Sequence, residues 1–316
     1  MKILSNWGVN LADVCLISDK ASIVNSRNDI EMDMSRIIHA PMSANQSKDF
    51  IKSAAQDGMS IVIHRFNTPQ EQKKLVELAE YHKKNSKVWL AVGLKDWEER
   101  CELNRSQLLY GSLGVCVDVA HSFSNSVQEV LKGICQKYPI VKQSTYLMTG
   151  NVNSTEGFQF SQQYAGIIRV NIGSGMACST TEATGFNQGS FSLLKELYEM
   201  PSRTAEIIFD GGLKTPGDFA KAFLGGADYC MTGGYFSSAL ETNSKFYYGG
   251  ASSMAKELTG ARGDYVEGKI ISTPNNKISM KELTGKLHDG LASAVSYSGH
   301  RTLKSSIGQG TFVRFK

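Results

Sequence analysis

Eight short apolar runs alternate with helical segments along the chain, and this alternation constrains the fold more than any other feature of the sequence. The runs end in polar or glycine residues and cover 37–40, 60–64, 88–93, 114–118, 145–150, 166–172, 205–210 and 227–232. Segments with helical spacing lie between most of them, for example 69–85, 125–138 and 216–224. Apolar strands separated by helices require a parallel sheet covered by helices, and eight such units that close on themselves form a (β/α)8 barrel. We therefore predict an α/β fold, a single-domain (β/α)8 TIM barrel over residues 1–316, with an open doubly wound sheet as the alternative.

The composition is that of an ordinary compact protein. Apolar residues make up 41% of the chain and charged residues 20%, which excludes disordered and collagen-like chains. The net charge of +4 comes from scattered residues, so we expect a small-molecule ligand and no nucleic-acid partner. No apolar run approaches the ~20 residues of a membrane span, and the N-terminus lacks the apolar stretch of a signal peptide, so we expect no membrane partner and a cytoplasmic location. The six cysteines show no CxxC spacing, which argues against structural zinc and a disulfide scaffold.

Polar residues follow several of the predicted strands, where a barrel of this kind carries its active site. The first strand leads into Ala40-Pro41-Met42-Ser43, and the second into His64-Arg65-Phe66, where His64 is more simply a hydrogen-bonded structural residue. Asp118-Val119-Ala120-His121 follows the fourth strand and offers groups that could hold a ribose diol, although Asp118 could instead cap a helix. Thr149-Gly150-Asn151-Val152 ends the fifth, where glycine permits close backbone approach and asparagine is both donor and acceptor.

The loop after the sixth strand carries the strongest signal. It reads Asn171-Ile172-Gly173-Ser174-Gly175-Met176-Ala177-Cys178-Ser179-Thr180, and its two glycines favour a turn whose N–H groups can face a phosphate. The third glycine of a GxGxxG fingerprint is replaced by Cys178, so a dinucleotide-binding fold is not indicated. A thiol on such a loop, with Thr180 two residues on, could serve as a nucleophile; the alternative is an inert buried cysteine.

Paired glycines follow the last two strands, as Asp210-Gly211-Gly212 and Thr232-Gly233-Gly234. In (β/α)8 barrels these two loops often build a phosphate site, although glycine pairs also occur in simple turns. The predicted ligand is therefore a phosphorylated molecule with a diol beside a reactive cysteine, a description that fits a nucleoside monophosphate.

Together these motifs resemble the IMP dehydrogenase and GMP reductase family. The run 173–180, with Thr184-Gly185-Phe186 downstream, resembles the catalytic cysteine loop of that family. Other segments are similar to family segments and occur in the same order: Asp118-Val119-Ala120-His121-Ser122, Thr149-Gly150-Asn151-Val152, Asp210-Gly211-Gly212, Pro216-Gly217-Asp218, Tyr248-Gly249-Gly250-Ala251-Ser252 and Ser296-Tyr297-Ser298-Gly299. Several motifs in order are more specific than any one of them. The resemblance covers nearly the whole chain and implies the same barrel fold.

Within the family, two features resemble the reductases. The helical segment that ends near residue 85 runs directly into the strand at 88, without the regulatory CBS pair that most dehydrogenases insert there. Ile63-His64-Arg65-Phe66, Val92-Gly93-Leu94-Lys95-Asp96 and Val266-Glu267-Gly268-Lys269 are similar to bacterial GMP reductases, and the Arg-Tyr pair of the dehydrogenase flap is not evident. Two alternatives stay open: an IMP dehydrogenase without CBS domains that oxidises IMP to XMP with NAD, and a purine-nucleotide-binding regulator without catalysis.

The resemblance implies NADPH-dependent reductive deamination of GMP to IMP and ammonia. Cys178 would attack C2 of the purine and form a covalent thioimidate, while Thr180 and Glu267 would relay the proton that the leaving ammonia needs. It also implies an active-site flap over about 240–275, a C-terminal segment 281–316 that closes over the nucleotide, and a homotetramer.

The resemblance further implies three sets of binding residues. Substrate contacts fall on Met42, Ser174, Gly175, Asp210, Gly211, Gly212, Gly233, Gly234, Gly250, Ala251 and Ser252. Cofactor contacts fall on Asp118, Ala120, His121, Asn151 and Thr184, and backbone carbonyls of Gly173, Gly175 and Cys178 match a K⁺ site of the dehydrogenases. Pro41 departs from the family, which usually has an asparagine there, and motivates the hypothesis of an altered nucleotide preference, such as a deoxynucleotide.

Overall fold

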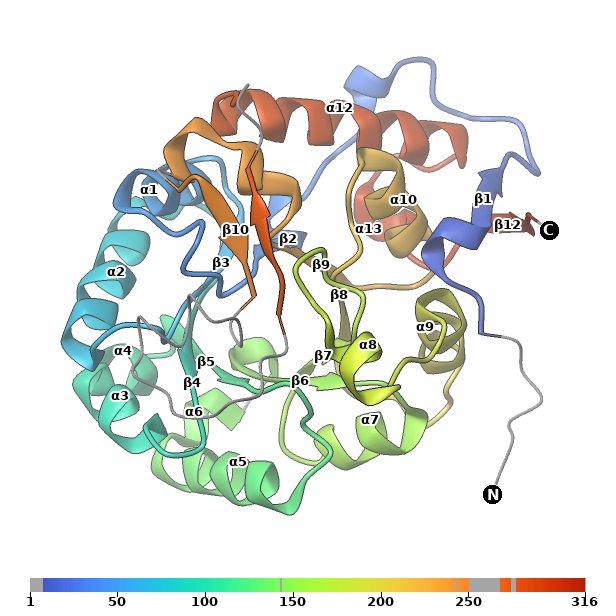
Figure 1. The fold of residues 1–316 in the computed structure, drawn as a ribbon. Coiled ribbons are helices and arrows are strands. Elements are labelled where there is room, and N and C mark those ends of the chain that lie inside the picture. The colour runs from blue at the N-terminus through green and yellow to red at the C-terminus, as the bar shows by residue number, and fades with distance from the viewer. Residues whose placement is uncertain (1–7, 143, 243, 250–267, 274–276, 316) are drawn as a thin grey trace.

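The fold is a closed barrel of eight parallel strands inside a ring of helices (Figure 1). The computed structural model describes residues 8–142, 144–242, 244–249, 268–273 and 277–315. The barrel strands follow one another in chain order as β2 (Ile37–His39), β3 (Ser60–Ile63), β4 (Val88–Val92), β5 (Leu113–Asp118), β6 (Leu147–Val152), β7 (Ile167–Val170), β8 (Glu206–Asp210) and β9 (Tyr229–Thr232). Parallel pairing of β9 with β2, from Ile37 opposite Cys230 to His39 opposite Thr232, closes the barrel. The predicted (β/α)8 barrel is confirmed, and the open sheet is excluded.

Helices cover the outside of the barrel, and short helices also occur within the loops. They are α1 (Lys48–Gln56), α2 (Pro69–His82), α3 (Trp97–Leu103), α4 (Arg105–Leu109), α5 (Asn125–Lys137), α6 (Pro139–Lys142), α7 (Thr155–Ser161), α8 (Thr180–Thr184), α9 (Ser190–Tyr198), α10 (Pro216–Leu224), α12 (Met280–Tyr297) and α13 (Leu303–Ser306). Short 3₁₀ turns occupy Leu11–Asp13, Arg27–Asp29, Met34–Arg36, Ser144–Tyr146, Tyr235–Ser238 and Leu240–Thr242. Helices α2 and α10 both begin with a threonine capping box and a proline in the first turn, which fixes where each of them starts. Among the described residues, no helix is both long enough and apolar enough to cross a membrane.

The core has two layers, because most barrel strands are buried on both faces. One layer fills the barrel interior with Ile38, Val62, Trp89, Ala91, Cys116, Met148, Ile167, Ile208, Tyr229 and Met231. The other, larger layer lies between the strands and the surrounding helices. Burial on both faces explains why the strands read as nearly continuous apolar runs rather than as alternating patterns.

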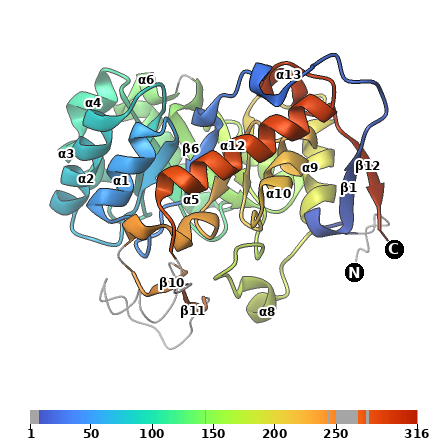
Figure 2. The same cartoon turned by 90° about the horizontal axis from the view of Figure 1, so that it is seen from above.

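Two small antiparallel sheets are added to the barrel. Strand β1 (Val14–Ile17) pairs with β12 (Thr311–Arg314) near the ends of the chain, at the right of Figure 1. Strands β10 (Phe246–Tyr248) and β11 (Ile270–Ser272) form the stem of the expected flap. This stem projects from the same face of the barrel as α8 (Figure 2).

Some expected boundaries differ from the observed ones. The strand expected over 166–172 ends at Val170, because Asn171 adopts a positive φ of 85° and turns the chain. The helix expected over 69–85 ends at His82, since Lys83 is extended. The C-terminal segment lies on the outside of the barrel, where α12 packs against α10 and α1, and its expected closure over the nucleotide stays a prediction. None of its described residues lines the pocket.

Candidate active site

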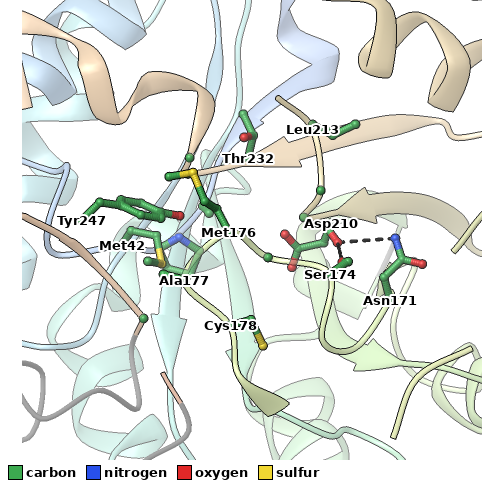
Figure 3. Close-up of a pocket in the computed structure, with 18 of the residues that line it drawn as sticks. Met42, Asn171, Ser174, Met176, Ala177, Cys178, Asp210, Leu213, Thr232 and Tyr247 are labelled. Carbon is green, nitrogen blue, oxygen red and sulfur yellow. Dashed lines mark hydrogen bonds between the residues drawn. The ribbon is translucent and has the colours of Figure 1, made fainter. Parts of the chain in front are cut away.

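A cavity of about 740 Å³ opens at the C-terminal ends of the barrel strands (Figure 3). Loops that follow most of the barrel strands contribute to its lining, and the stem of the flap adds Tyr247 and Ile271. In the view of Figure 3, Asp210, Ser174 and Asn171 lie on one side of the pocket and Met42 and Tyr247 on the other. The pocket is therefore where the barrel architecture predicts an active site.

Most of the residues predicted from the sequence line this one cavity. They are Met42, Asp118, Ala120, Asn151, Gly173, Ser174, Gly175, Cys178, Thr180, Asp210, Gly211, Gly212, Gly233 and Gly234. His121 and Thr184 do not line it: the ring of His121 lies 6.5 Å from that of Phe186, and the Thr184 hydroxyl donates to the Thr180 carbonyl at 2.7 Å. Glu267, Gly250, Ala251 and Ser252 lie outside the described residues.

The loop between β7 and α8 holds the candidate nucleophile. The half-buried Cys178 thiol donates to the Thr180 hydroxyl oxygen at 3.2 Å, and the Cys178 amide donates to the Gly175 carbonyl at 3.0 Å. Gly173 has a φ of 83°, and a Cβ on it would overlap the Thr181 hydroxyl, so the turn requires glycine. The loop thus brings a thiol and a hydroxyl together in the pocket, which is the arrangement that nucleophilic catalysis with a nearby proton carrier needs.

Three glycine-containing loops pack against one another beside this cysteine. A Cβ on Gly211 would lie 2.7 Å from Ser174 Oγ and 3.0 Å from the Gly175 amide nitrogen, and one on Gly234 would lie 3.3 Å from Met176 Cε. Within the described part of the chain, the amides of Ser174, Gly175, Gly212, Gly233 and Gly234 donate to no protein acceptor. Unbonded amides gathered in this way form a cradle suited to an anion such as a phosphate.

The K⁺ site expected at the carbonyls of Gly173, Gly175 and Cys178 stays a prediction. The Gly175 carbonyl already accepts the Cys178 amide hydrogen, which leaves it one lone pair for a cation. Among the described residues, no group of three or more His, Cys, Asp or Glu side chains is placed to hold a metal ion.

A largely buried chain of charges lines the pocket and links several strands. Asp118 Oδ1 accepts from Arg169 Nη1 at 2.7 Å, and Asp118 Oδ2 lies 3.6 Å from Arg65 Nε. Arg169 also reaches Asp210 Oδ2 at 3.0 Å, and Asn151 Nδ2 donates to the same oxygen at 2.9 Å. We call Arg65, Asp118, Arg169 and Asp210 the charge chain.

Electrostatics keep Asp118 ionised. Burial alone would raise the pKa of this carboxyl, but the guanidinium groups of Arg169 and Arg65 outweigh it and hold the pKa below its ordinary value. The N-cap of the next helix, α5, is Ser124, so the alternative role of Asp118 as a helix cap is wrong. Asp118 therefore presents a carboxylate to the pocket.

Arg169 is one of the pocket residues that sequence reasoning misses. It occupies the middle of the apolar strand β7 (Ile167–Val170), and its side chain is 9% exposed. A charged residue within a buried strand is itself a signal, because arginine is almost never buried without a partner. Gly150 on the neighbouring strand leaves room for this side chain because it has no Cβ. A Cβ at this position would overlap the Cβ of Arg169.

The opposite wall of the pocket is apolar and belongs partly to the flap stem. Ala44, Ala177, Tyr247 and Tyr248 form a buried cluster, against which Met42 and Ile271 pack. The stem is fastened to the cysteine loop, since the Lys269 amide donates to the Ala177 carbonyl at 2.9 Å and the Lys269 ammonium pairs with Glu182 of α8. Tyr247 was not predicted as a site residue, because its place depends on how the flap stem folds back onto the barrel.

His64 plays the simpler of its two expected roles. It is buried outside the pocket lining, and its Nδ1 accepts the Phe66 amide hydrogen at 3.2 Å. Burial, aided by the nearby Arg100 guanidinium, lowers the pKa of His64 to about 4. It is thus a neutral structural residue at neutral pH.

Fold and site together define a (β/α)8-barrel protein whose pocket combines a cysteine and a hydroxyl with the backbone amides of glycine loops and with ion-paired carboxylates. The chain belongs to the IMP dehydrogenase and GMP reductase family of enzymes: residues 10–315 match the family model described as the IMP dehydrogenase / GMP reductase domain. It is 30% identical to a GMP reductase of Streptococcus agalactiae serotype V over 314 residues, which covers 93% of this chain and 91% of the relative. A GMP reductase of Helicobacter pylori strain J99 is also 30% identical, over 93% of this chain and 92% of its own.

Proposed function

We propose that this protein is a GMP reductase, which converts GMP to IMP and ammonia with NADPH as the reductant. The observation that carries the proposal is the contact between the Cys178 thiol and the Thr180 hydroxyl, 3.2 Å apart in the pocket. Similarity along almost the whole chain to proteins named GMP reductase supports it. So does the short connection from α2, which ends at His82, to β4, which begins at Val88 and leaves no room for an inserted domain.

The pocket offers separate groups for the phosphate and the ribose of GMP. The amides of Ser174, Gly212, Gly233 and Gly234, which donate to no acceptor in the described part of the chain, suit the phosphate, because backbone N–H dipoles bind anions without a charged side chain. One oxygen of Asp210 is taken by Arg169 and Asn151, whereas the other accepts no hydrogen bond from the described residues. That free oxygen is our proposed acceptor for the ribose hydroxyls.

The reaction needs a nucleophile and a proton donor at purine C2. The Cys178 thiolate adds to C2, the bond from C2 to the exocyclic nitrogen breaks, and the nitrogen departs as ammonia once it has been protonated. Thr180 is placed to pass that proton, with Glu267 as its proposed partner, and general acid catalysis of this kind contributes typically ~10²–10⁴-fold. The sulfur then leaves C2 as the thiolate when IMP forms.

The cofactor is proposed to lie along Asp118, Ala120 and Asn151, on the side of the pocket next to His121. The ionised Asp118 fits a ribose diol, since a carboxylate accepts two hydroxyl hydrogens. When bound, NADPH supplies the hydride that replaces the amino group at C2. His121 and Thr184 keep their proposed cofactor role only if a bound cofactor extends beyond the pocket lining.

The test is to follow reduced nicotinamide by absorbance with GMP, dGMP or IMP, each paired with each nicotinamide cofactor, and to separate the products by chromatography. Loss of NADPH with formation of IMP and ammonia from GMP is the expected result. Faster turnover of dGMP would assign the departure at Pro41, which lines the pocket, to a deoxynucleotide preference. Formation of NADH from IMP would make the protein a dehydrogenase, and nucleotide binding without any turnover would make it a regulator.

The variant Cys178→Ala should lose turnover and keep GMP binding. Cys135→Ala is the matched control, because Cys135 is also half-buried but does not line the pocket. Unchanged turnover in Cys178→Ala would refute the role of this thiol.

A further inference from the structure

Arg169 connects two carboxylates that come from different parts of the barrel. Its Nη1 lies 2.7 Å from Asp118 at the end of β5, and its Nη2 lies 3.0 Å from Asp210 at the end of β8. Its Nε donates to Asp210 as well, at 3.0 Å, so every nitrogen of the guanidinium is engaged. A single side chain thus holds the two carboxylates that the described residues contribute to the pocket lining.

Stability alone gives no reason for this arrangement. Arg169, Asp118 and Asp210 have exposed side-chain fractions of 9%, 14% and 13%, so all three charges are largely removed from water. The desolvation of buried ion pairs offsets most of their attraction, and apolar residues of similar size often stabilise a protein as well or better. Their place in the pocket points to ligand binding rather than to folding.

The hydrogen bonds of Arg169 also decide which carboxylate oxygens remain for a ligand. Arg169 and Asn151 both donate to Asp210 Oδ2, and among the described residues Asp210 Oδ1 accepts nothing. On the other side, Arg169 takes Asp118 Oδ1 and leaves Oδ2 near Arg65, which lies at the pocket lining. The guanidinium therefore sets the orientation of both carboxylates at once.

We infer that Arg169 is a positioning residue that couples the nucleotide site at Asp210 to the cofactor site at Asp118. The inference rests on the proposed function, which assigns those two sites. Both carboxylates share one guanidinium, so a ligand that shifts one carboxylate also acts on the guanidinium and, through it, on the second carboxylate. Binding of either ligand thereby favours binding of the other, and the coupling is reciprocal.

The experiment measures binding of GMP and NADP⁺ by calorimetry, each alone and in the presence of the other; this pair has no hydride to transfer, so no turnover disturbs it. In the wild type we expect each ligand to raise the affinity for the other about fivefold or more. In Arg169→Met we expect each affinity to fall about tenfold and the mutual enhancement to disappear. Asp210→Asn should weaken only the binding of GMP, and Asp118→Asn should weaken only the binding of NADP⁺.

Arg203→Met is the matched control. Arg203 pairs with Asp228 at 2.7 Å, at the opposite end of β8, and lines no part of the pocket. Its loss should lower thermal stability without changing either affinity. If Arg169→Met does not fold, the same measurements are made on Arg169→Lys. Its ammonium keeps the charge but lacks the planar guanidinium that reaches both carboxylates.

Affinities and coupling in Arg169→Met or Arg169→Lys within twofold of the wild type would overturn the inference while leaving the proposed function in place. Failure of the wild type to bind GMP would instead remove the proposed function, and the inference with it.

Discussion

His39 should make this protein lose stability in mild acid. The side chain, 1% exposed, lies behind the barrel wall between the rings of Phe50 and Phe236, with centroid distances of 4.8 Å and 4.4 Å. Neither ring nitrogen has a hydrogen-bond partner among the described residues, and burial lowers the pKa of His39 to about 3. The folded protein therefore holds this imidazole neutral.

The sign follows from proton binding. Below its ordinary pKa of 6.5 the unfolded chain takes up a proton on His39, whereas the folded protein does so only near pH 3. Acid therefore favours the unfolded state, and the free energy of unfolding falls by up to about 1.4 kcal/mol per pH unit between these values, about 5 kcal/mol in all. Between about pH 7.5 and pH 5 the loss attributable to His39 is about 2 kcal/mol.

The variant His39→Leu removes both the proton site and the unpaired nitrogens. It should stabilise the protein by about 1–3 kcal/mol at neutral pH, since an unsatisfied buried polar group costs roughly that much. Its advantage over the wild type should grow by a further 2 kcal/mol or so at about pH 5. Urea unfolding followed by circular dichroism at several pH values measures the difference in the free energy of unfolding between variant and wild type. The contribution of the other buried histidine, His64, cancels because both proteins contain it.

His288→Leu serves as the control, because it makes the same substitution at a side chain that is 44% exposed rather than buried. A difference between His39→Leu and the wild type that stays constant from neutral pH to about pH 5 would refute the reasoning.

Three further predictions concern glycines and the charge chain. Gly285→Ala, in helix α12 with nothing within 4 Å of the new methyl group, should raise the free energy of unfolding by about 0.5–1 kcal/mol in urea titration; a loss would contradict this. Gly150→Ala should instead destabilise the protein by about 1–3 kcal/mol, since its Cβ would overlap Arg169, and wild-type stability in that variant would show that β7 can shift freely. Asp210→Asn should raise the KM for GMP about tenfold with a smaller change in kcat, which steady-state kinetics can measure. An equal fall in kcat and kcat/KM would contradict this prediction.

The barrel was predictable from the sequence because its strands are buried on both faces and therefore read as uninterrupted apolar runs. The cysteine loop and the glycine pairs were predictable for a related reason: their position after a strand places them at the mouth of the barrel. The exact end of β7 was not predictable, since the turn depends on a positive φ at Asn171. Asparagine tolerates this conformation, but its presence in a sequence does not predict it.

Contacts between distant segments limited the prediction of the site. The role of Arg169 cannot be predicted from its neighbours in the sequence, because its partners, Asp118 and Asp210, lie 51 and 41 residues away. Tyr247 reaches the pocket on the flap stem, which is hydrogen-bonded to Ala177 of the cysteine loop, far away in the sequence. His121, by contrast, follows a strand like the other candidates, but its ring lies near Phe123 and Phe186 and does not line the pocket.

The charge chain also bears on how such a pocket can diverge. Arg65, Asp118, Arg169 and Asp210 alternate in sign and sum to zero, so replacing any one of them by a neutral residue leaves an unbalanced charge among largely buried groups. Exchanging a cation together with its neighbouring carboxylate keeps the balance. Related proteins should therefore change these positions in pairs, and a lineage that alters the ligand at one end of the pocket will tend to alter the other end with it.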